Sequence, residues 1–357
     1  MPGVLEDDMH EIASDPVISW SEMKNWRILV TGATGTIGSA LVRGLHAASE
    51  KHGLGIEILA LGRDESKAEP LIKKYGAVFI RNDIREPLSL KGKADCVFHC
   101  AALAKSPDMA SNPVGVIETS LKGTMNVLEF AREKRVKSMV FLSSMEVYGI
   151  TDPALPFVSE SMLGEIDLNS SRSCYPESKR MCENMCFCYF AQHKVPVKMA
   201  RLAQTFGAGS SKHDTLVAAQ FAKSAVSGKD IILHTEGASR GNYCYISDAV
   251  RALILICAKG ENGQAYNVSN PDASMTIREM ADLVAGISKN GVSVVMEKPA
   301  DFEKRGYAPN VTRRLSSEKM EGLGWQPKYG LSQMYLRMMS DWLESGTAVE
   351  SECASAI

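Results

Sequence analysis

The sequence lacks a hydrophobic run of the ~18 residues that a membrane-spanning helix needs. It also lacks a strong charge of one sign, because 40 Lys and Arg stand against 42 Asp and Glu, a formal net charge of −2. Near-neutral charge argues against general binding to nucleic acid or anionic membranes. The acidic stretch from Met1 to His10 has no apolar segment of the kind found in secretory signals. We therefore expect a cytoplasmic protein with neither a nucleic-acid nor a membrane partner.

A set of metal ligands at zinc-site spacing is missing too. The nine cysteines are scattered, and Cys182 and Cys186 lie four residues apart on one predicted helix. No Cys/His pair at the spacing of a zinc site accompanies them. Buried free thiols in a reducing compartment are the favoured interpretation, and no metal is expected. The chain likewise shows no internal repeat and no long low-complexity linker.

What the sequence does contain is a glycine-rich turn near its start. The apolar stretch Arg27–Val30 reads as the end of a buried strand, and Gly32, Gly35 and Gly38 follow in the spacing G-x-x-G-x-x-G. A helical pattern begins at Ser39. Glycine lets the backbone turn sharply and approach phosphates, and the free N–H groups of the helix N-terminus attract them. A glycine triplet also occurs in plain structural turns, but this strand–turn–helix context favours a dinucleotide site.

Strands and helices alternate along the first 205 residues. Each strand is nearly all apolar, which predicts a parallel sheet covered on both faces. Further strands are predicted at 56–61, 77–80, 94–101, 138–143 and 195–202, and helices around 115–135 and 176–194. Later helices are predicted at 215–227, 247–259, 276–288 and 331–344, and short strands at 230–234, 265–268 and 293–296. The expected fold class is therefore α/β, a Rossmann-type doubly wound sheet with a smaller C-terminal substrate-binding lobe.

We divide the chain into four parts. Residues 1–24 are an N-terminal extension, whose apolar stripe either packs on the body or contacts a partner. Residues 25–205 form the NAD(P)-binding domain, with a returning segment at about 240–268. Residues 206–345 are mainly the substrate-binding lobe, and residues 346–357 are a flexible tail. The stripe of the extension consists of Leu5, Met9, Ile12 and Val17.

A possible acid–base constellation comes from two distant segments. Tyr175 and Lys179 lie four residues apart, so on a helix they share a face. An ammonium near a phenol favours the phenolate, so Tyr175 could act as a base near neutral pH. Ser144 ends the strand at 138–143, where ligands bind in open parallel sheets, and its hydroxyl could hydrogen-bond the reacting oxygen. An ordinary strand-end cap is the alternative role for Ser144.

Together these motifs resemble the extended short-chain dehydrogenase/reductase family, the NAD-dependent epimerases and dehydratases that modify nucleotide sugars. The motifs in family order are the glycine turn, Asp83-Ile84, His99-Cys-Ala-Ala102, Ser144 with Val147-Tyr-Gly149, Tyr175 with Lys179, Arg201-Leu202 and Tyr245-Ile-Ser-Asp248. The resemblance implies an NAD cofactor that oxidises a sugar hydroxyl, usually at C4. It makes Tyr175 the base, has Lys179 hold the ribose, and has Ser144 bind the reacting oxygen.

The resemblance also implies the cofactor contacts. They would come from Gly32, Thr34, Gly35, Thr36, Ile37, Gly38, Arg63, Asp83, Ile84, Ala101, Ala102, Tyr175 and Lys179. Arg63 departs from the family pattern, since an aspartate for the ribose hydroxyls usually follows the second strand. A basic residue there suits a 2′-phosphate, so NADP is an alternative to NAD. Stacking on adenine or simple exposure is the other interpretation of Arg63.

Within the family, the middle of the chain looks most like UDP-glucuronate decarboxylases. The likeness rests on Thr119-Ser120, on Ser144-Met-Glu146, on Arg172-Ser-Cys-Tyr-Pro-Glu-Ser-Lys-Arg180 and on Gln204-Thr-Phe-Gly207. It makes Glu146 a fourth catalytic residue, unless Glu146 only caps or pairs with an arginine. Substrate contacts would come from Lys105, Ser120, Arg172, Gln204 and Arg240.

The leading hypothesis is thus C4 oxidation of a nucleotide sugar followed by decarboxylation. Epimerisation at C4 is the first alternative. Dehydration across C4 and C6 is the second, because Met145 replaces the aspartate that such enzymes use. A non-catalytic sensor of the cofactor is the alternative of another class, and the intact Ser144, Tyr175 and Lys179 set argues against it.

Other residues have two interpretations each. Arg180, Arg201, Arg240, Arg313 and Arg314 are either diphosphate contacts or structural, and surface pairing is expected for at least one of the last three. His99 reads more readily as a packed histidine than as a catalytic one. Relatives commonly form homodimers through a four-helix bundle, here the helices near 115–133 and 176–194. Apolar faces at Val127, Phe130, Met185 and Tyr189 are consistent with such a homodimer and equally with packing inside one subunit.

Overall fold

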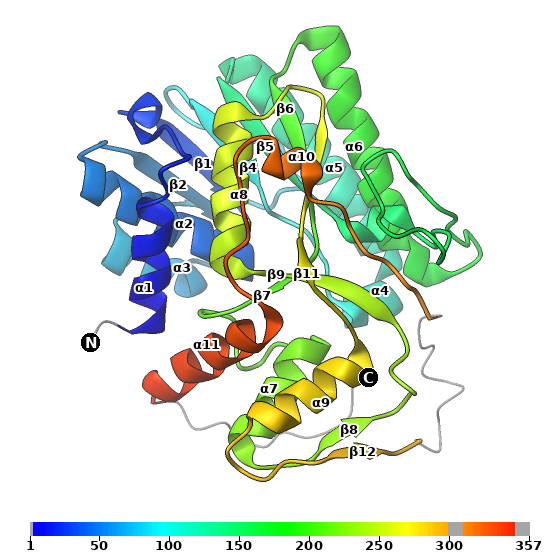
Figure 1. Ribbon diagram of the computed structural model, residues 1–357. Helices are drawn as coiled ribbons and strands as arrows, with labels where there is room; N and C mark the ends of the chain where they lie inside the picture. The colour runs from blue at the N-terminus through cyan, green and yellow to red at the C-terminus, as the bar shows by residue number, and fades with distance from the viewer. Residues whose placement is uncertain (1–2, 299–309, 347–357) are drawn as a thin grey trace.

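Seven parallel strands form the largest sheet of the structure, a computed structural model that describes residues 3–298 and 310–346 (Figure 1). The strand order is β10-β6-β5-β4-β1-β2-β3. The strands are β1 (Arg27–Thr31), β2 (Glu57–Gly62), β3 (Val78–Arg81), β4 (Cys96–His99), β5 (Ser138–Ser144), β6 (Val197–Leu202) and β10 (Ala265–Val268). This is the order of a doubly wound Rossmann sheet, so the predicted fold class is confirmed.

Side chains of the central strands alternate between two hydrophobic cores. Ile28 and Val30 of β1 face one core and Leu29 faces the other, and all three are fully buried. The first core is covered by α2 (Thr36–His52) and α8 (Ile246–Lys259), and the second by α5 (Pro113–Lys134) and α6 (Cys174–His193). Because both faces are covered, the strands read in the sequence as nearly continuous apolar runs.

The order of the strands in the sheet reverses at β1. The carboxyl ends of β1, β4 and β5 lie next to this point, along one edge of the sheet. From β1 the order runs to β2 and β3 on one side and to β4, β5 and β6 on the other. Ligands of open α/β sheets bind at such a switch point. The glycine turn after β1 and Ser144 at the end of β5 both lie at this edge.

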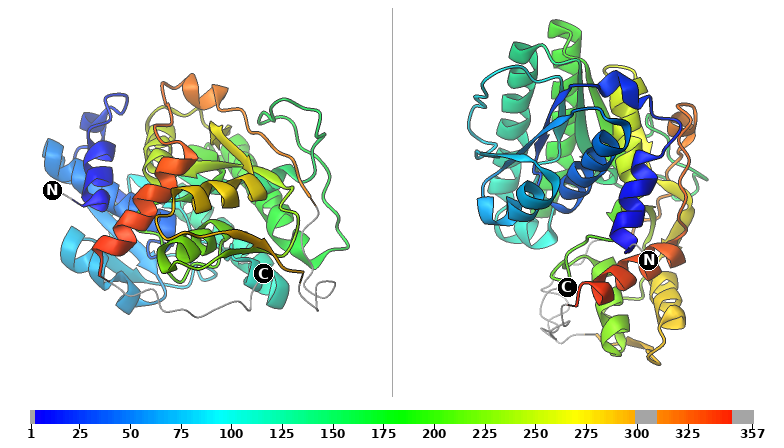
Figure 2. Two further views of the ribbon diagram at one scale, coloured as in Figure 1. Left: turned by 60° about the horizontal axis from the view of Figure 1, so that its bottom comes forward. Right: turned by 90° about the vertical axis from the view of Figure 1, so that its left-hand side faces the viewer.

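A smaller part lies beyond this edge (Figure 2). Two small sheets belong to it, one of β7 (Gln204–Phe206), β9 (Arg240–Tyr245) and β11 (Asn270–Thr276), the other of β8 (Ile231–Leu233) and β12 (Val294–Met296). Its helices are α7 (Val217–Ser227), α9 (Ile277–Ile287) and α11 (Leu331–Glu344), whereas the short α10 (Glu318–Glu321) packs against β10 of the large sheet (Figure 1). The predicted helices and short strands fall within a few residues of these, whereas β7, β9 and β11 were not predicted. The chain returns to the large sheet with α8 and β10.

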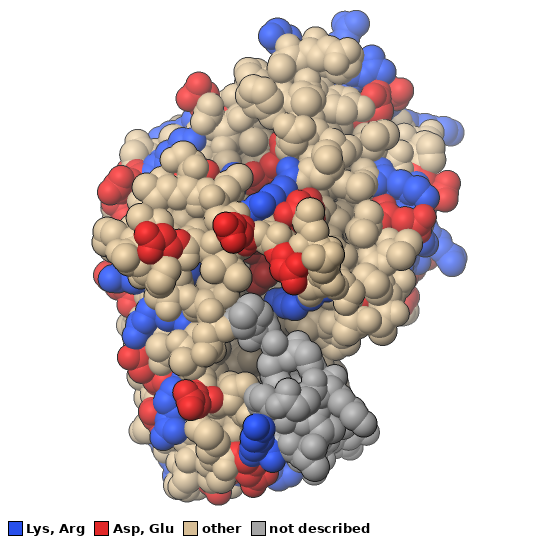
Figure 3. Space-filling view, turned by 90° about the vertical axis from the view of Figure 1, so that its right-hand side faces the viewer, with Lys and Arg blue, Asp and Glu red and all other residues tan. Residues whose placement is uncertain are grey.

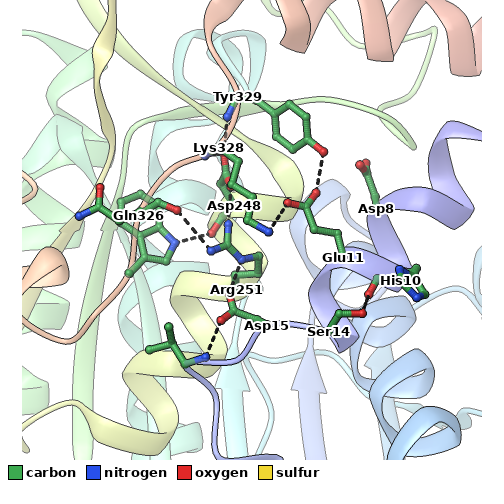
Figure 4. Close-up of polar contacts among 12 residues, drawn as sticks. Asp8, His10, Glu11, Ser14, Asp15, Asp248, Arg251, Gln326, Lys328 and Tyr329 are labelled. Atoms are coloured by element: carbon green, nitrogen blue, oxygen red, sulfur yellow. Dashed lines mark hydrogen bonds and ion pairs between the residues drawn. The ribbon is translucent and has the colours of Figure 1, made fainter.

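The N-terminal segment packs on the body as α1 (Val4–Ala13), with Ile12 of the predicted stripe only 3% exposed. Asp8 pairs with Arg337 of α11 at 2.6 Å, and Asp15 pairs with Arg251 of α8. Figure 4 shows how α1 and the turn after it face α8 and the chain before α11. Removing one partner of such a buried pair typically costs about 3–5 kcal/mol, so the segment is an integral part of the fold.

Two further α-helices and three short 3₁₀ turns belong to the larger part. The helices are α3 (Glu65–Tyr75), between β2 and β3, and α4 (Ser106–Ser111), before α5, and the turns are at Trp20–Met23, Met145–Tyr148 and Ser171–Ser173. None of the described helices combines the length and apolar composition needed to cross a lipid bilayer.

Candidate active site

The glycine turn is packed too tightly for any other residue. Gly32 has a φ of +65°, and a Cβ there would lie 2.8 Å from the backbone of Ala101 beyond β4. A Cβ at Gly38 would lie 2.3 Å from the carbonyl oxygen of Gly32. Real Cβ atoms do not approach backbone so closely, and a positive φ itself favours glycine. The turn therefore brings the start of α2 against the ends of β1 and β4.

The N-terminus of α2 presents backbone N–H groups without a side-chain cap. Its N-cap is Gly35, which offers no acceptor, and Thr36 and Ile37 in the first turn are partly exposed. Thr34 lies close to the end of β2. A Cβ added at Gly62 would lie 3.8 Å from Thr34 Cγ2. Free N–H groups and the helix dipole stabilise an anion here. The cradle fits the pyrophosphate of a dinucleotide.

Charged side chains gather beyond β2 and β3, where the adenosine of a dinucleotide would lie. Arg85 donates two hydrogen bonds to Asp83, at 2.7 and 3.0 Å, and these bonds lower the pKa of Asp83 to about 2. Arg63 is exposed, and its charge contributes to that lowered pKa. Asp64 caps α3 by accepting the N–H of Ser66, so its carboxylate is already bound. Among the described residues, Arg63 is an exposed cation at the end of β2 with no hydrogen bond or ion pair of its own.

The wall behind this cradle is apolar. Ile84 is 6% exposed and lies against α5. A Cβ added at Gly123 of this helix would lie 3.0 Å from Ile84 Cγ2. Ala101 and Ala102 are half-buried beyond β4, and the N–H of Ala101 donates to Thr31 Oγ1 at 3.3 Å. The predicted cofactor residues thus lie along one continuous edge, from the glycine turn to the end of β4.

His99 is a packed histidine. Its Nδ1 lies 2.8 Å from Thr31 Oγ1 and its Nε2 lies 3.3 Å from Thr124 Oγ1. Burial lowers the pKa of His99 to about 3, with a further contribution from Lys179, so the ring is neutral. His99 therefore links β1 to α5 through hydrogen bonds and does not face the reacting groups.

Ser144 and Tyr175 meet at the carboxyl end of β5. Ser144 is the last residue of β5 and Tyr175 is the second residue of α6, and their side chains share a hydrogen bond. Lys179 Nζ donates to the carbonyl oxygen of Leu142 at 2.6 Å and lies 5.8 Å from the centre of the Tyr175 ring. The three side chains predicted to carry the chemistry are therefore adjacent.

The protonation of Tyr175 differs from the sequence-based expectation. Burial raises the pKa of Tyr175 to about 12, although the hydrogen bond with Ser144 lowers it. Burial also lowers the pKa of Lys179, whose ammonium points to a backbone carbonyl. Loss of solvation thus opposes the phenolate that was expected near neutral pH, and the role of Tyr175 as a base stays a prediction.

Glu146 pairs with one arginine and interacts electrostatically with a second. Its Oε2 is 3.6 Å from Arg172 Nη2. Arg313 is 7% exposed, its Nη2 donates to the carbonyl oxygen of Gly149 at 2.5 Å, and its Nε has no hydrogen-bond partner within the described part of the chain. Burial lowers the pKa of Arg313, and the charge of Glu146 opposes that shift. The pairing with Arg172, one of the alternatives for Glu146, is therefore present, and the charge of Arg313 acts on the same carboxylate.

Arg313 was predicted only as a diphosphate contact or a structural arginine. It reaches this site from the segment before α10, 167 residues after Glu146, and no sequence signal links the two. Figure 3 shows acidic and basic side chains meeting where this face of the molecule is hollowed between its two parts.

Two of the predicted substrate residues differ in how their polar groups are bound. Ser120 lies on α5 and is 5% exposed, and its Oγ has no hydrogen-bond partner among the described residues. Its carbonyl accepts a hydrogen bond from the thiol of Cys182 on α6. Arg172 donates to the sulfur of Met109 as well as facing Glu146. Ser120 and Arg172 remain predicted substrate contacts.

The other three predicted substrate residues are exposed or already bound to the protein. Lys105 is exposed at the N-cap of α4, and Gln204 is exposed on β7. Arg240 is paired with Glu279 at 2.8 Å and donates to the carbonyl oxygen of Ser274 at 3.0 Å. The structure thus places the Arg240 guanidinium on the surface of the small lobe, the alternative stated for one of these arginines.

Arg180 and Arg201 hold the framework of the site. Arg180 donates to the carbonyl oxygens of Val147 and Gly164 at 2.7 and 2.6 Å. Arg201 is 6% exposed and pairs with Glu183 of α6 at 2.6 Å. Both arginines fix α6 against the ends of β5 and β6, so they position Tyr175 and do not face a ligand.

Metal-binding clusters are not found in the described residues. No group of three or more His, Cys, Asp or Glu side chains there is arranged to hold an ion. Cys182 and Cys186 are both buried free thiols.

Comparison with known proteins establishes the family. Residues 28–269 match the NAD dependent epimerase/dehydratase family. The chain belongs to this family. UDP-glucuronic acid decarboxylase 6 of Arabidopsis thaliana is 32% identical over 323 residues, 89% of this chain and 89% of that protein. UDP-glucuronic acid decarboxylase 1 of Danio rerio is 30% identical over 89% of this chain and 73% of its own length.

Solved structures of the family have the same fold. UDP-glucose 4-epimerase from Thermotoga maritima has a TM-score of 0.76 at 21% identity, over 90% of this chain and 100% of that chain. Family membership confirms the predicted resemblance, and with it the expectation of an NAD-dependent enzyme.

Proposed function

We propose that this protein oxidises UDP-glucuronate at C4 and releases CO2, giving a UDP-pentose. The observation that carries the proposal is the ion pair of Arg172 with Glu146, next to Ser144 and Tyr175, with the buried Arg313 close enough for its charge to interact with that of Glu146. Two guanidinium groups and one carboxylate leave a positive charge in the pocket. A uronate carries its carboxylate at C6, one carbon from the C5 that adjoins C4. The pocket therefore suits an anionic sugar better than a neutral one.

The unbound Nε of Arg313 supports the same conclusion. A buried guanidinium with a free N–H is a strong donor for a carboxylate, because hydrogen bonds between charged groups are short and strong. Arg172 is half-exposed and is held by a 3.6 Å ion pair with Glu146 and a hydrogen bond to the sulfur of Met109, so it can turn to a substrate. A carboxylate that bridges these two arginines would be held beside Glu146.

The chemistry assigned to each residue follows from its position. Ser144 donates a hydrogen bond to the C4 oxygen and Tyr175 accepts the C4 hydroxyl proton. When bound, the nicotinamide ring accepts a hydride from C4 and later returns it. Lys179, on the face of α6 that carries Tyr175, binds the ribose hydroxyls of the cofactor. Glu146 repels the substrate carboxylate in the ground state, and that repulsion ends as CO2 leaves.

Epimerisation at C4 of a nucleotide sugar is the alternative, and dehydration ranks below it. Met145 is 7% exposed and packs in the core, so no acidic side chain stands where a 4,6-dehydratase needs one. Incubation with UDP-glucuronate, read by mass spectrometry, tests the proposal. We expect a product 44 mass units lighter. An unchanged mass with a new isomer would support epimerisation, and no turnover of any UDP-, CDP-, GDP- or dTDP-sugar would contradict both.

Replacing Arg313 with methionine should raise KM for UDP-glucuronate by about 10–100-fold, because one of the two donors to the carboxylate is lost. The matched control is Arg314→Met, since Arg314 is exposed and stacks on Phe157 with its Cζ 4.8 Å from the ring centre. Steady-state kinetics of CO2 release measures both. Equal KM values for Arg313→Met and the parent protein would remove Arg313 from the substrate site.

We further propose that the adenosine end accepts NADP more tightly than NAD. Arg63 is the exposed cation at the end of β2, and the nearby Asp64 is engaged in capping α3. Arg63→Ala should erase the difference in Kd between the two cofactors, whereas Lys67→Ala, a cation on α3, should leave it unchanged. Fluorescence titration of both cofactors measures this. Equal affinities of the parent protein for NAD and NADP would contradict the role.

A homodimer through α5 and α6 is our proposal for assembly. Val127 and Phe130, whose apolar faces were consistent with either a dimer or packing inside one subunit, are buried inside the subunit. The outer faces carry other apolar side chains, with Met125 of α5 50% exposed and Met181 of α6 51% exposed. Apolar area of this kind on adjacent helices is typical of a subunit interface.

Light scattering after size exclusion is expected to give twice the chain mass of 38.8 kDa. Met181→Glu should shift the mass toward the single chain, because it buries a charge in the interface. Leu343→Glu is the control, since Leu343 is 67% exposed on α11, away from these helices. A parent protein that elutes as a single chain would contradict the homodimer.

A further inference from the structure

Two thiols are in contact deep in the larger part of the protein. Cys96 Sγ, at the start of β4, lies 3.2 Å from Cys257 Sγ in the last turn of α8. The two residues are 0% and 3% exposed, and 161 residues of chain separate them. Both are free cysteines, and neither takes part in the chemistry proposed above.

A buried lysine accompanies this thiol pair. Lys198 of β6 is 4% exposed, and its Nζ donates to Ser138 Oγ at 2.9 Å and to the carbonyl oxygen of Pro196 at 3.3 Å. Among the residues that the structure describes, no carboxylate lies within 4.0 Å of this ammonium. The groups whose charge acts on Lys198 are the thiols of Cys257 and Cys96.

An ammonium in the protein interior needs a compensating negative charge or becomes neutral. The group able to supply that charge here is a thiolate. Ser138 joins the two sites, because its Oγ accepts from Lys198 and donates to the carbonyl oxygen of Cys257 at 2.8 Å. Lys198, Ser138 and Cys257 thus form one polar cluster, with Cys96 as the neighbouring thiol.

We propose that Cys96 and Cys257 form a redox-active pair in which the Cys257 thiolate, balanced by Lys198, reacts with a hydroperoxide and Cys96 then closes a disulfide. The two thiols have different tendencies to ionise. The hydrogen bond from Cys96 lowers the pKa of Cys257, and Ser138 and Lys198 add to this effect against burial. Burial raises the pKa of Cys96 well above its usual range. Cys257 is therefore the attacking sulfur and Cys96 the resolving one.

The reaction balances with hydrogen peroxide as the oxidant. The Cys257 thiolate attacks one peroxide oxygen, the O–O bond breaks, and the products are the Cys257 sulfenic acid and hydroxide. Hydroxide removes the Cys96 thiol proton to give water. The Cys96 thiolate then attacks the Cys257 sulfur, the S–S bond forms, and the S–O bond breaks to release hydroxide. Two electrons pass from the sulfurs to the peroxide, which is reduced to water and hydroxide.

The position of the pair in the fold determines its accessibility and its effect. It lies at the amino ends of the strands, the opposite edge of the sheet from Ser144, so the disulfide should not alter the catalytic groups directly. Asp95, the residue before Cys96, is bridged by the exposed side chains of Lys93 and Lys137. Opening of the last turn of α8 would admit a small oxidant. The new bond would tie α8 to β4 and constrain the unfolded chain.

Peroxide treatment of the intact protein tests the proposal directly. Free thiols are alkylated with a light reagent after oxidation, the protein is reduced, and the released thiols are labelled with a heavy reagent. We expect the heavy label on Cys96 and Cys257, a mass lower by 2 units for the pair, and a Tm higher by more than about 5 °C that dithiothreitol reverses. Oxidation of the exposed Cys188 shows that the peroxide has reacted with the protein. If Cys96 and Cys257 then both carry the light label, the proposal is overturned.

Variants separate the roles of the cluster. Cys257→Ala should abolish the rise in Tm, whereas Cys244→Ala, which removes a fully buried thiol elsewhere, should retain it. Lys198→Met should slow disulfide formation by at least about tenfold, because the thiolate loses its counter-ion. Oxidation of Lys198→Met at the parent rate would contradict the role of the lysine. If a variant does not fold, the labelling of the parent protein still decides whether the pair forms.

Discussion

Tyr175→Phe is expected to lower kcat by ~10²–10⁴-fold, the usual effect of removing a positioned general base. The phenol shares a hydrogen bond with Ser144 and lies on the face of α6 that carries Lys179. No other titratable oxygen of this helix meets Ser144. Phenylalanine keeps the buried ring, so the fold and the cofactor content should be unchanged. Turnover of UDP-glucuronate, with absorbance of the bound cofactor as a check, measures the effect.

The matched control is Tyr189→Phe. Tyr189 lies on the same helix, but its hydroxyl donates to Glu129 at 2.5 Å and is remote from Ser144. The same chemical change there should leave kcat within about twofold. Near-parent activity of Tyr175→Phe, or an equal loss in both variants, would remove Tyr175 from the mechanism.

The pH profile gives a second measure of the same residue. Burial raises the pKa of Tyr175 to about 12, so the phenol is protonated at neutral pH. A base acts in its deprotonated form, and the deprotonated fraction grows as pH rises toward the pKa. We therefore expect kcat/KM to rise by about tenfold per pH unit over the neutral and mildly alkaline range. A flat profile in the parent protein would contradict a base with a raised pKa.

Glu146→Gln is expected to slow CO2 release by about 10²-fold while C4 oxidation persists. Like charges ~4 Å apart repel by about 4 kcal/mol at an effective dielectric of 20, and loss of CO2 relieves this repulsion. Arg172 and Arg313 reduce the repulsion between Glu146 and the substrate carboxylate enough for a uronate to bind. Glutamine at position 146 would remove the remaining repulsion. The variant should accumulate reduced nicotinamide, visible by its absorbance, because oxidation proceeds and decarboxylation does not.

Glu177→Gln controls for the loss of a carboxylate near the site. Glu177 lies on α6 and pairs with Arg180 at 3.3 Å, without contact to Glu146. CO2 release by this variant should match that of the parent protein. If Glu146→Gln releases CO2 at the parent rate, Glu146 has no part in decarboxylation. If the parent protein gives neither CO2 nor reduced cofactor with UDP-glucuronate, epimerisation of a neutral sugar becomes the leading function.

Local patterns in the sequence predicted the large sheet and its cradle. The glycine spacing after β1 demands close backbone approach, and the structure has it, with Gly32 against Ala101. Apolar runs marked β1 to β6 because both faces of a parallel sheet are covered. The strands at Arg240–Tyr245 and Asn270–Thr276 were missed, since Asn270-Pro-Asp272 disfavours a strand and the pairing contains a bulge at Asn270.

The sequence by itself determined the family, the fold class and the order of the motifs, because turns, helix faces and strand ends depend on residues close together in the chain. The tertiary structure alone decided which charges meet. It brings Arg313 to Glu146 and Lys198 to Cys257, and it pairs Arg240 with Glu279 away from the site. It also decides that Tyr175 is protonated, because the pKa depends on burial by segments far apart in the chain. Long-range contacts of this kind, and the loss of solvation that accompanies them, depend on tertiary packing. They leave no periodic signal in the sequence.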